Sequence, residues 1–448
     1  MKKLLVIMLL VCSVVSLFAN GASEATTAST TTAAVSQEEI EKVGGSPFEN
    51  TVKITFMNSK PEITEALEKG AKKFGEKFNV EIEISETSSP TDAIAQRYAA
   101  GDAPTILLVD GINIRDIYEE KLVDLSDEPW ASVGGEALGI ICKGKLYGMP
   151  VTVEGTCILY NKTAIEKTIG REFDPAEVAT LDGFNALLAE LKAGGMEYPV
   201  VLNAEDWSIG IHASLWMYTY QDGTEEGAAA FLQDVYYGKT TFEDNDVFNA
   251  YMDTLDVFIA NNINHNDPLA ADYDLNASYV AEGEAAFWVN GTWGWPDFEP
   301  YVTEGSEYGV MGWPINGHDD VAGRIICSAT KYIGIDRVDN DEDQQKAAKM
   351  FLNWLVFTDE GQSCLVNDCE ISPAFTNITL EMTNPFNTSL KSYVDRGLTV
   401  DTATYLQSDI RSATSSYLQA YLGGKLSRLE VAELYDAYWK SHLATIPE

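Results

Sequence analysis

Residues 51–84 read TVKITFMNSKPEITEALEKGAKKFGEKFNVEIEI, and this stretch decides the fold class. Apolar and polar residues alternate over 51–57, which predicts a β-strand. Apolar residues then recur at helical spacing through Ile63, Leu67, Ala71, Phe74 and Phe78. After Asn79, the sequence VEIEI predicts a second strand. A strand–helix–strand unit implies two parallel strands with a crossover helix, so we expect an α/β fold.

The same alternation continues in the next segment of the chain. A helix predicted over 93–100 and a GDAP turn precede the apolar strand TILLV, residues 105–109, with Asp110 at its carboxyl end. Ligands of open α/β sheets bind beyond the carboxyl ends of the strands, which makes Asp110 a candidate binding residue. Acidic residues also end strands simply to cap the next helix, so both interpretations of Asp110 stay open.

The N-terminus has the pattern of a targeting segment. Residues 1–19 carry two lysines, an apolar run and then small residues, which predicts a secretory signal peptide. Residues 20–50 begin with small and hydroxylated residues and are expected to form a flexible, low-complexity leader. We therefore expect an exported, periplasmic protein. The alternative is a lipoprotein anchored to the membrane through Cys12.

Charge is the strongest signal in the composition. Lys and Arg total 30 and Asp and Glu total 69, which gives a formal net charge of −39. A surface this acidic repels phosphate backbones, so a nucleic-acid partner is not expected. It suits a neutral or cationic small ligand, although a solvated acidic surface accounts for most of the charge.

The chain shows no motif for metal binding or catalysis. The signal-peptide prediction leaves five cysteines, which cannot all pair within one chain: Cys142, Cys157, Cys327, Cys364 and Cys369. The local pairs to test are Cys142 with Cys157 and Cys364 with Cys369. No C-x-x-C motif, no metal-ligand spacing of histidines and no P-loop, G-x-S-x-G or H-E-x-x-H motif is present. We therefore expect no metal, no cofactor and no enzymatic activity.

Residues 283–295, GEAAFWVNGTWGW, concentrate three tryptophans in a short stretch. Alternation predicts a strand with Phe287 and Val289 on one side and Trp288 on the other. Gly291 would end this strand and leave Trp293 on an irregular turn, where its ring is hard to bury completely. An exposed ring in a cleft suits the apolar face of a sugar or a quaternary amine. For Trp288, as for Trp295 and Trp354, a place in the hydrophobic core is the favoured interpretation.

Four segments, in this order, resemble one known family. They are RYAAGDAPTILLVDG (97–111), KLYGMPVTVEGTCILYNK (145–162), YVAEGEAAFWVNGTWGW (279–295) and AAKMFLNWLVFTDEGQ (347–362). The family is that of the extracellular solute-binding proteins of ABC importers, in the carbohydrate-binding branch that includes maltose-binding protein. The resemblance extends from about residue 51 to residue 442.

The resemblance implies a two-lobe periplasmic-binding-protein fold with hinge strands and a ligand cleft between the lobes. The first lobe would comprise 51–153 plus 323–371, and the second 158–318 plus 374–448. Such proteins alternate between open and closed forms, and ligand shifts the population towards the closed form. The implied partners are a saccharide and the permease subunits of an ABC importer, and the protein is expected to be a monomer.

The resemblance also implies ligand-binding residues. Glu154 matches a carboxylate that binds sugar hydroxyls, and Trp207 and Trp293 match stacking aromatic positions. Lys60 and Asp110 match polar ligand contacts more loosely.

The chain departs from the maltose type at two positions. Val109 and Arg411 replace aromatic residues, and Arg411 is kept as a sixth candidate ligand-binding residue. We therefore expect a mono- or oligosaccharide other than maltodextrin. The alternative is a cationic ligand such as a polyamine or betaine. A third hypothesis is an exported glycosidase, which needs two carboxyl groups about 5–10 Å apart.

Overall fold

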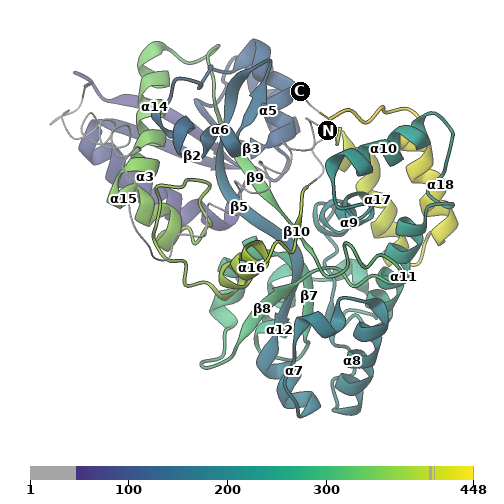
Figure 1. Ribbon diagram of the computed structural model, residues 1–448. Coiled ribbons are helices and arrows are strands. Elements are labelled where there is room, and N and C mark those ends of the chain that lie inside the picture. The colour runs from purple at the N-terminus through teal and green to yellow at the C-terminus, as the bar shows by residue number, and fades with distance from the viewer. Residues whose placement is uncertain (1–46, 403–405, 408, 447–448) are drawn as a thin grey trace, which may run out of the picture. The chain divides into compact units, whose positions relative to one another are not determined.

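The computed structural model describes residues 47–402, 406–407 and 409–446 (Figure 1). The expected signal peptide, Cys12 and nearly all of the expected leader lie outside the described residues. The described chain forms two compact units. Among the described residues, unit 1 comprises 47–153 and Ala329–Met382, and unit 2 comprises Glu154–Ser328 and the described residues from Thr383 onward.

The sheet of unit 1 is built on the strand–helix–strand segment at the start of the fold. Strand β1 (Val52–Asn58) pairs in parallel with β2 (Val80–Glu86) and with β3 (Ile106–Asp110), and helix α3 (Thr64–Phe78) connects β1 to β2. The predicted parallel pair and crossover helix are confirmed. Strand β9 (Ile325–Ile335) lies antiparallel to β3.

Helices cover both faces of this sheet. The side chains of Ile106 and Leu108 join one hydrophobic core, whereas Leu107 and Val109 join another. The first core includes α3 and α14 (Glu342–Phe357), and the second includes residues of α4 (Pro90–Ala100) and α5 (Gly111–Lys121). Burial on both faces explains why β3 is continuously apolar.

Aromatic rings fill the core beneath α3 and α14. The ring centroids of Phe74 and Phe351 are 5.2 Å apart, and those of Phe351 and Trp354 are 5.9 Å apart. Trp354 is fully buried, which confirms its predicted place in the core. A capping box between Asp341 and Gln344 begins α14 by satisfying backbone groups at the end of the helix.

The central strands of unit 2 include the second part of β5 (Lys145–Asn161), a strand that begins in unit 1. Strands β7 (Phe287–Gly291) and β8 (Tyr308–Met311) pair antiparallel with β5, and β6 (Val200–Val201) pairs in parallel with β7. Phe287 and Val289 enter one hydrophobic core and Trp288 enters another, as the alternation predicts.

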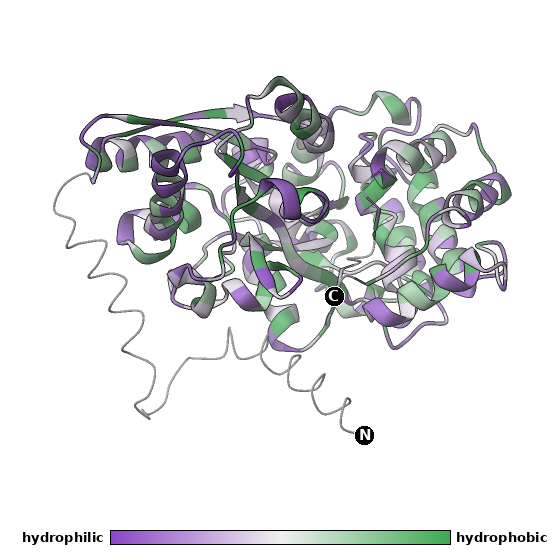
Figure 2. Cartoon of the chain, turned by 90° about the horizontal axis from the view of Figure 1, so that it is seen from above, coloured by the Kyte–Doolittle hydropathy of each residue, from purple (hydrophilic) through white to green (hydrophobic). Residues whose placement is uncertain are grey.

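Helices make up most of the rest of unit 2. The longer helices are α7 (Lys162–Ile169), α8 (Leu181–Ala193), α10 (Glu225–Tyr236), α11 (Asp246–Ala260), α12 (Tyr273–Ala281), α16 (Pro385–Asp395), α17 (Ile410–Leu422) and α18 (Arg428–Trp439). Figure 2 shows hydrophobic residues recurring between hydrophilic ones along the helices, as amphipathic helices require.

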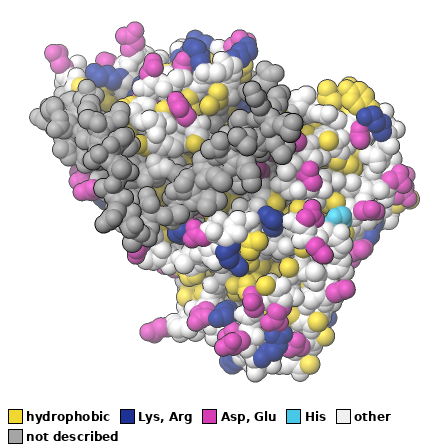
Figure 3. All heavy atoms as spheres, in the orientation of Figure 1, with side chains coloured by type: hydrophobic (Ala, Val, Ile, Leu, Met, Phe, Trp, Pro, Cys, Tyr) yellow, Lys and Arg dark blue, Asp and Glu magenta, His cyan; other side chains and the backbone are white. Residues whose placement is uncertain are grey.

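The surface carries the charge that the composition indicates. Figure 3 shows acidic side chains spread over the described part of this face, interspersed with basic ones. Among the residues that the structure describes, no helix has the length and apolar character needed to cross a membrane.

Candidate functional site

Trp293 lies on a short 3-10 turn, η6 (Thr292–Gly294), directly after β7. A Cβ atom on Gly291 would lie 2.1 Å from the ring of Trp293, and one on Gly294 would lie 2.8 Å from Nδ2 of Asn290. Glycine at both positions therefore lets the Trp293 ring and the Asn290 amide approach the backbone closely. The ring is half-buried, in agreement with the expectation that it escapes full burial.

Four aromatic side chains of unit 2 form a group that we call the aromatic cluster: Trp207, His212, Tyr273 and Trp293. The centroid of the His212 ring lies 4.6 Å from that of Trp293 and 5.5 Å from that of Trp207. The Trp207 and Tyr273 centroids are 5.6 Å apart. Both tryptophans that the sequence singles out as stacking residues thus lie around one histidine, on segments far apart in the sequence.

The remaining tryptophans of the quoted stretch are structural. The indole Nε1 of Trp288 donates a hydrogen bond of 2.7 Å to Oδ1 of Asn203, and Trp288 is fully buried. Trp295 is also buried, and its ring meets that of Phe386 edge-on at 5.2 Å. Their predicted core positions are confirmed.

A polar loop carries Trp207 into the aromatic cluster. Asn203 begins this loop; its Nδ2 donates to Oγ of Ser208 at 3.0 Å, and its Oδ1 accepts a bond from Asn276 at 2.9 Å. Ser208 begins η4 (Ser208–His212), a single π-helical turn that brings His212 back towards Trp207. The loop is therefore fixed at both ends by hydrogen bonds with buried residues.

Asp206, within this loop, forms an ion pair with Arg411 on α17. Arg411 Nε lies 2.8 Å from Oδ2 of Asp206, and Nη2 lies 2.6 Å from Oδ1. Oδ1 also accepts a hydrogen bond from the backbone N–H of Trp207 at 2.8 Å. The Arg411 hydrogen bonds are the largest of the causes that lower the pKa of Asp206. Arg411 therefore supports the loop before Trp207, and a direct ligand contact by Arg411 stays a prediction.

Three polar atoms in this region are buried and have no hydrogen-bond partner among the residues that the structure describes. They are Oε2 of Glu205, Oδ1 of Asn290 and Nε1 of Trp293. Burial raises the pKa of Glu205, and the charges of Asp272 and Asp206 raise it further. Buried polar groups are normally hydrogen-bonded, so one donor and two acceptor groups here are suited to a ligand with several hydroxyl groups.

Glu154 is buried on β5 and is the first residue of unit 2. The next residue, Gly155, donates its backbone N–H to Oγ1 of Thr292 at 3.1 Å. Thr292 precedes Trp293, so this hydrogen bond connects the strand of Glu154 to the turn that carries Trp293.

Lys60 and Asp110 belong to unit 1, at the carboxyl ends of β1 and β3. Lys60 is buried, and its Nζ lies 2.6 Å from Oε1 of Glu62. Asp110 is half-exposed, and its Oδ1 lies 2.7 Å from Nζ of Lys331 on β9, which also donates to Oγ of Ser59 at 3.2 Å. Two ion pairs, Lys60 with Glu62 and Lys331 with Asp110, thus lie where open α/β sheets bind their ligands.

The structure explains one of the departures noted in the sequence. Val109 is fully buried in the core beside α5, so this position contributes to packing in this chain. The other departure, Arg411, has its charge paired with Asp206 as described above.

Sequence reasoning missed several residues that the structure brings to these places. Glu205 and Asp206 stand in the motif NAEDW, directly before Trp207. Their position beside a predicted stacking residue is a local signal that could have identified them. His212, Tyr273 and Lys331 carry no local signal, because each reaches its position through contacts between distant segments.

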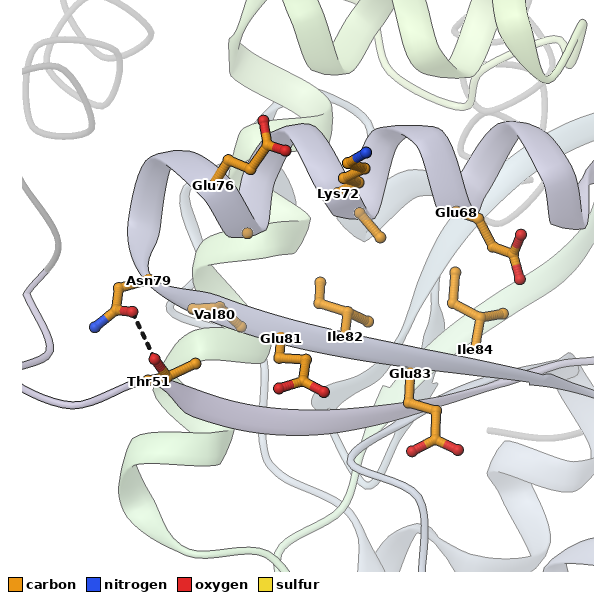
Figure 4. A pocket seen from close by; sticks show the side chains of 12 residues that line it. Thr51, Glu68, Lys72, Glu76, Asn79, Val80, Glu81, Ile82, Glu83 and Ile84 are labelled. Carbon is orange, nitrogen blue, oxygen red and sulfur yellow. Dashed lines mark hydrogen bonds between the residues drawn. The ribbon is translucent and has the colours of Figure 1, made fainter.

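Unit 1 has a hollow between α3 and β2, with a volume of about 570 Å³ (Figure 4). Figure 4 shows Ile82 and Ile84 pointing towards α3, whereas Glu81 and Glu83 point away from it. No aromatic ring lines this hollow, and none of the six predicted ligand-binding residues does so. The described residues also contain no group of three or more His, Cys, Asp or Glu side chains arranged to hold a metal ion.

Comparison with known proteins gives the class of this protein. The model of the family of bacterial extracellular solute-binding proteins matches residues 69–388. The chain therefore belongs to this family of solute-binding proteins.

Solved structures share the fold at low sequence identity. A chitin oligosaccharide binding protein matches with a TM-score of 0.70 and 18% identity, covering 88% of this chain and 100% of its own. The raffinose complex of the solute-binding protein RafE matches with a TM-score of 0.69 and 17% identity, covering 88% and 100%. A manno-oligosaccharide specific protein from Bifidobacterium animalis subsp. lactis, in complex with mannotriose, has a TM-score of 0.64 and 18% identity, covering 88% and 95%.

Proposed function

We propose that this protein binds a mono- or oligosaccharide and delivers it to the permease subunits of an ABC importer. The observation that carries the proposal is the aromatic cluster of unit 2 together with the partnerless polar atoms of Glu205, Asn290 and Trp293. Aromatic rings cover the C–H faces of sugars, and the polar atoms offer hydrogen bonds to hydroxyl groups. The similar structures support the same ligand class, because they include a chitin oligosaccharide binding protein, a raffinose complex and a mannotriose complex.

Each predicted site residue has a role in this proposal. Trp207 and Trp293 stack on the sugar, and Glu154 accepts hydrogen bonds from its hydroxyl groups. Lys60 and Asp110 supply the polar contacts of unit 1, and Arg411 positions the loop of Trp207. In this proposal the ligand-binding lobes are 51–153 plus 323–371 and 158–318 plus 374–448.

Cellular location and assembly belong to the same proposal. The protein is exported to the periplasm through a signal peptide at 1–19 and acts as a monomer. It is not an enzyme, and anchoring through Cys12 is the alternative to a soluble form.

A cationic ligand has less support from the charges around Trp207. Arg411 pairs with Asp206, and burial disfavours the charged form of Glu205, the other acid of this loop, which raises its pKa. An uncompensated negative charge beside the rings would add to their attraction for a cationic ligand, and the pairing of Asp206 removes one such charge.

Thermal unfolding against a ligand panel tests the proposal. The panel contains mono- and oligosaccharides, polyamines and betaine. A ligand at about 100 times its Kd stabilises a protein by about 2.7 kcal/mol, which raises Tm by several degrees. We expect a shift with one saccharide class. A shift with amines alone would overturn the saccharide assignment, as would no shift with any sugar.

Two variants give this experiment its control. Trp293→Ala should lose the sugar-induced shift while its Tm without ligand stays close to that of the wild type. Tyr237→Ala removes an aromatic ring that is 61% exposed and lies outside the aromatic cluster, so its sugar-induced shift should be unchanged.

A further inference from the structure

Cys364 and Cys369 flank one π-helical turn of unit 1. This turn, η8 (Cys364–Asp368), follows α15 (Asp359–Ser363), and the backbone N–H of Cys369 donates to the carbonyl of Cys364 at 2.8 Å. Both residues are buried, and both thiols are free in this structure. A π-helical turn brings residues five positions apart onto the same side of the helix, so it brings this local pair of cysteines together.

The two thiols meet inside this turn. They share a hydrogen bond, which lowers the pKa of Cys364 and raises that of Cys369, where burial raises it further. The charged groups around the two thiols shift these pKa values less than the hydrogen bond and burial do. Asp368 disfavours both thiolates, Lys73 favours the thiolate of Cys364, and Lys60 favours that of Cys369. The hydrogen bond from Cys369 therefore favours the thiolate of Cys364.

Packing against α3 holds the sulfur of Cys364 in place. A Cβ atom on Gly70 would lie 2.5 Å from this Sγ, so only glycine leaves room for the sulfur there. The Sγ also lies 3.7 Å from the carbonyl oxygen of Ala66, as a weak hydrogen-bond donor. One sulfur is thus held by its neighbours, and the backbone bond of 2.8 Å closes the turn between the two cysteines, which brings their backbones close together, as a disulfide requires.

We infer that Cys364 and Cys369 are a disulfide site, and that this bond forms when the folding chain meets a disulfide oxidant. The Cys364 thiolate attacks one sulfur of the oxidant RSSR, and RS⁻ leaves and takes up the proton that Cys364 released. The Cys369 thiolate then attacks the Cys364 sulfur of the mixed disulfide and displaces the second RS⁻, which takes up the proton of Cys369. In total, two protein thiols lose two electrons and two protons, and RSSR becomes two RSH.

The disulfide would fix the turn that directly precedes residues 370–372, a segment that is hydrogen-bonded to the end of the first part of unit 1. Glu370, directly after Cys369, has a left-handed φ of 53°, and Ile371 N–H donates to the carbonyl of Leu365 at 3.2 Å. Ser372 then accepts a hydrogen bond of 2.7 Å from the backbone of Val153, the last residue of unit 1 before the chain enters unit 2. The disulfide would thus restrain the chain directly before this contact.

Peptide mapping tests the inference. Because both thiols are buried, the reduced, unfolded protein is refolded in a buffer of reduced and oxidised glutathione, then denatured, alkylated and digested with trypsin. Both cysteines lie in the tryptic peptide 350–391. We expect this peptide to be unalkylated and lighter than its reduced form by two hydrogen atoms. Alkylation of both residues, or a bond from either to another cysteine, would overturn the inference.

Two variants distinguish the effect of this disulfide on thermal stability from that of the other cysteines. The oxidised wild type should unfold a few degrees above the reduced protein, and Cys364→Ser should abolish that difference. Cys142→Ser, on β4 (Ile140–Cys142), should retain it. If Cys364→Ser does not fold, the peptide map of the wild type still decides the question, and failed saccharide binding would leave this result unaffected.

Discussion

Arg411 donates hydrogen bonds to both carboxylate oxygens of Asp206, with N–O distances of 2.8 and 2.6 Å. The two residues lie 205 positions apart in the chain. The ion pair attaches α17 to the loop that presents Trp207. Both side chains remain about a third or more exposed, so its electrostatic contribution is screened by solvent. Its importance lies in fixing the loop.

Breaking this ion pair should lower both stability and saccharide affinity. We expect Arg411→Met and Asp206→Asn each to lower the free energy of unfolding, and the double variant to lose less than the sum, with a coupling of about 0.5 kcal/mol. Urea unfolding of the four proteins measures this coupling. A coupling of zero would show that the two residues act independently.

The pH dependence of the pair has a definite sign. The pKa of Asp206 is lowered in the folded state, so its stabilisation is present above its ordinary value of 3.8 and is lost as pH falls through the folded value. The stability difference between wild type and Asp206→Asn should therefore shrink on acidification below pH 3.8. A difference that grows there would contradict the assignment.

Glu205 should show the opposite dependence. Its folded pKa is raised above 4.5 because the buried carboxylate is disfavoured, so the wild type loses stability as pH rises above 4.5. Glu205→Gln removes this titration. The difference in Tm between the variant and the wild type should therefore change in favour of the variant as pH rises above 4.5. Calorimetry at several pH values measures the trend, and a Tm difference independent of pH would exclude the burial effect.

The contact between Gly291 and Trp293 predicts a thermodynamic cycle. Gly291→Ala places a methyl group 2.1 Å from the Trp293 ring, which must move at a cost of about 1–3 kcal/mol. In a Trp293→Ala background the obstacle is absent, so adding Gly291→Ala should cost much less. Denaturant unfolding measures the loss of stability caused by Gly291→Ala in the wild type and in Trp293→Ala. An equal loss in both proteins would show that the backbone, and not the Trp293 ring, causes the penalty.

Glu154→Gln should weaken saccharide binding more than it changes thermal stability. The amide keeps the size of the carboxylate but loses the charge that strengthens hydrogen bonds to hydroxyl groups, and about tenfold weaker binding corresponds to about 1.4 kcal/mol. Titration calorimetry beside a Tm measurement compares the two effects. Wild-type affinity in this variant would remove Glu154 from the binding site.

Local patterns in the sequence were enough to predict the central elements of unit 1. The spacing of Leu67, Phe74 and Phe78 predicts α3, and the structure buries all three. Asp110 ends β3 as expected, because a continuous apolar run followed by an acid is a local signal. Such features depend on neighbours within a few positions, which is why they can be read from one chain.

The side-chain arrangement of the candidate site could be predicted only in part. Trp207 and Trp293 were selected from motifs, but their meeting around His212 depends on the π-helical turn η4, for which the sequence gives no pattern. Lys331 reaches Asp110 through antiparallel pairing of β3 with β9, across 221 positions. Pairing between distant strands depends on the whole packed structure.

Strands β5 and β9 each begin in one unit and end in the other, and the chain passes from one unit to the other again between Met382 and Thr383. No single truncation therefore yields either unit intact. A fragment ending at Val153 would lack the part of β9 that pairs with β3, and would leave the apolar edge of that strand open to aggregation. Producing unit 1 alone would require a gene that joins Val153 to Ala329 through a new linker.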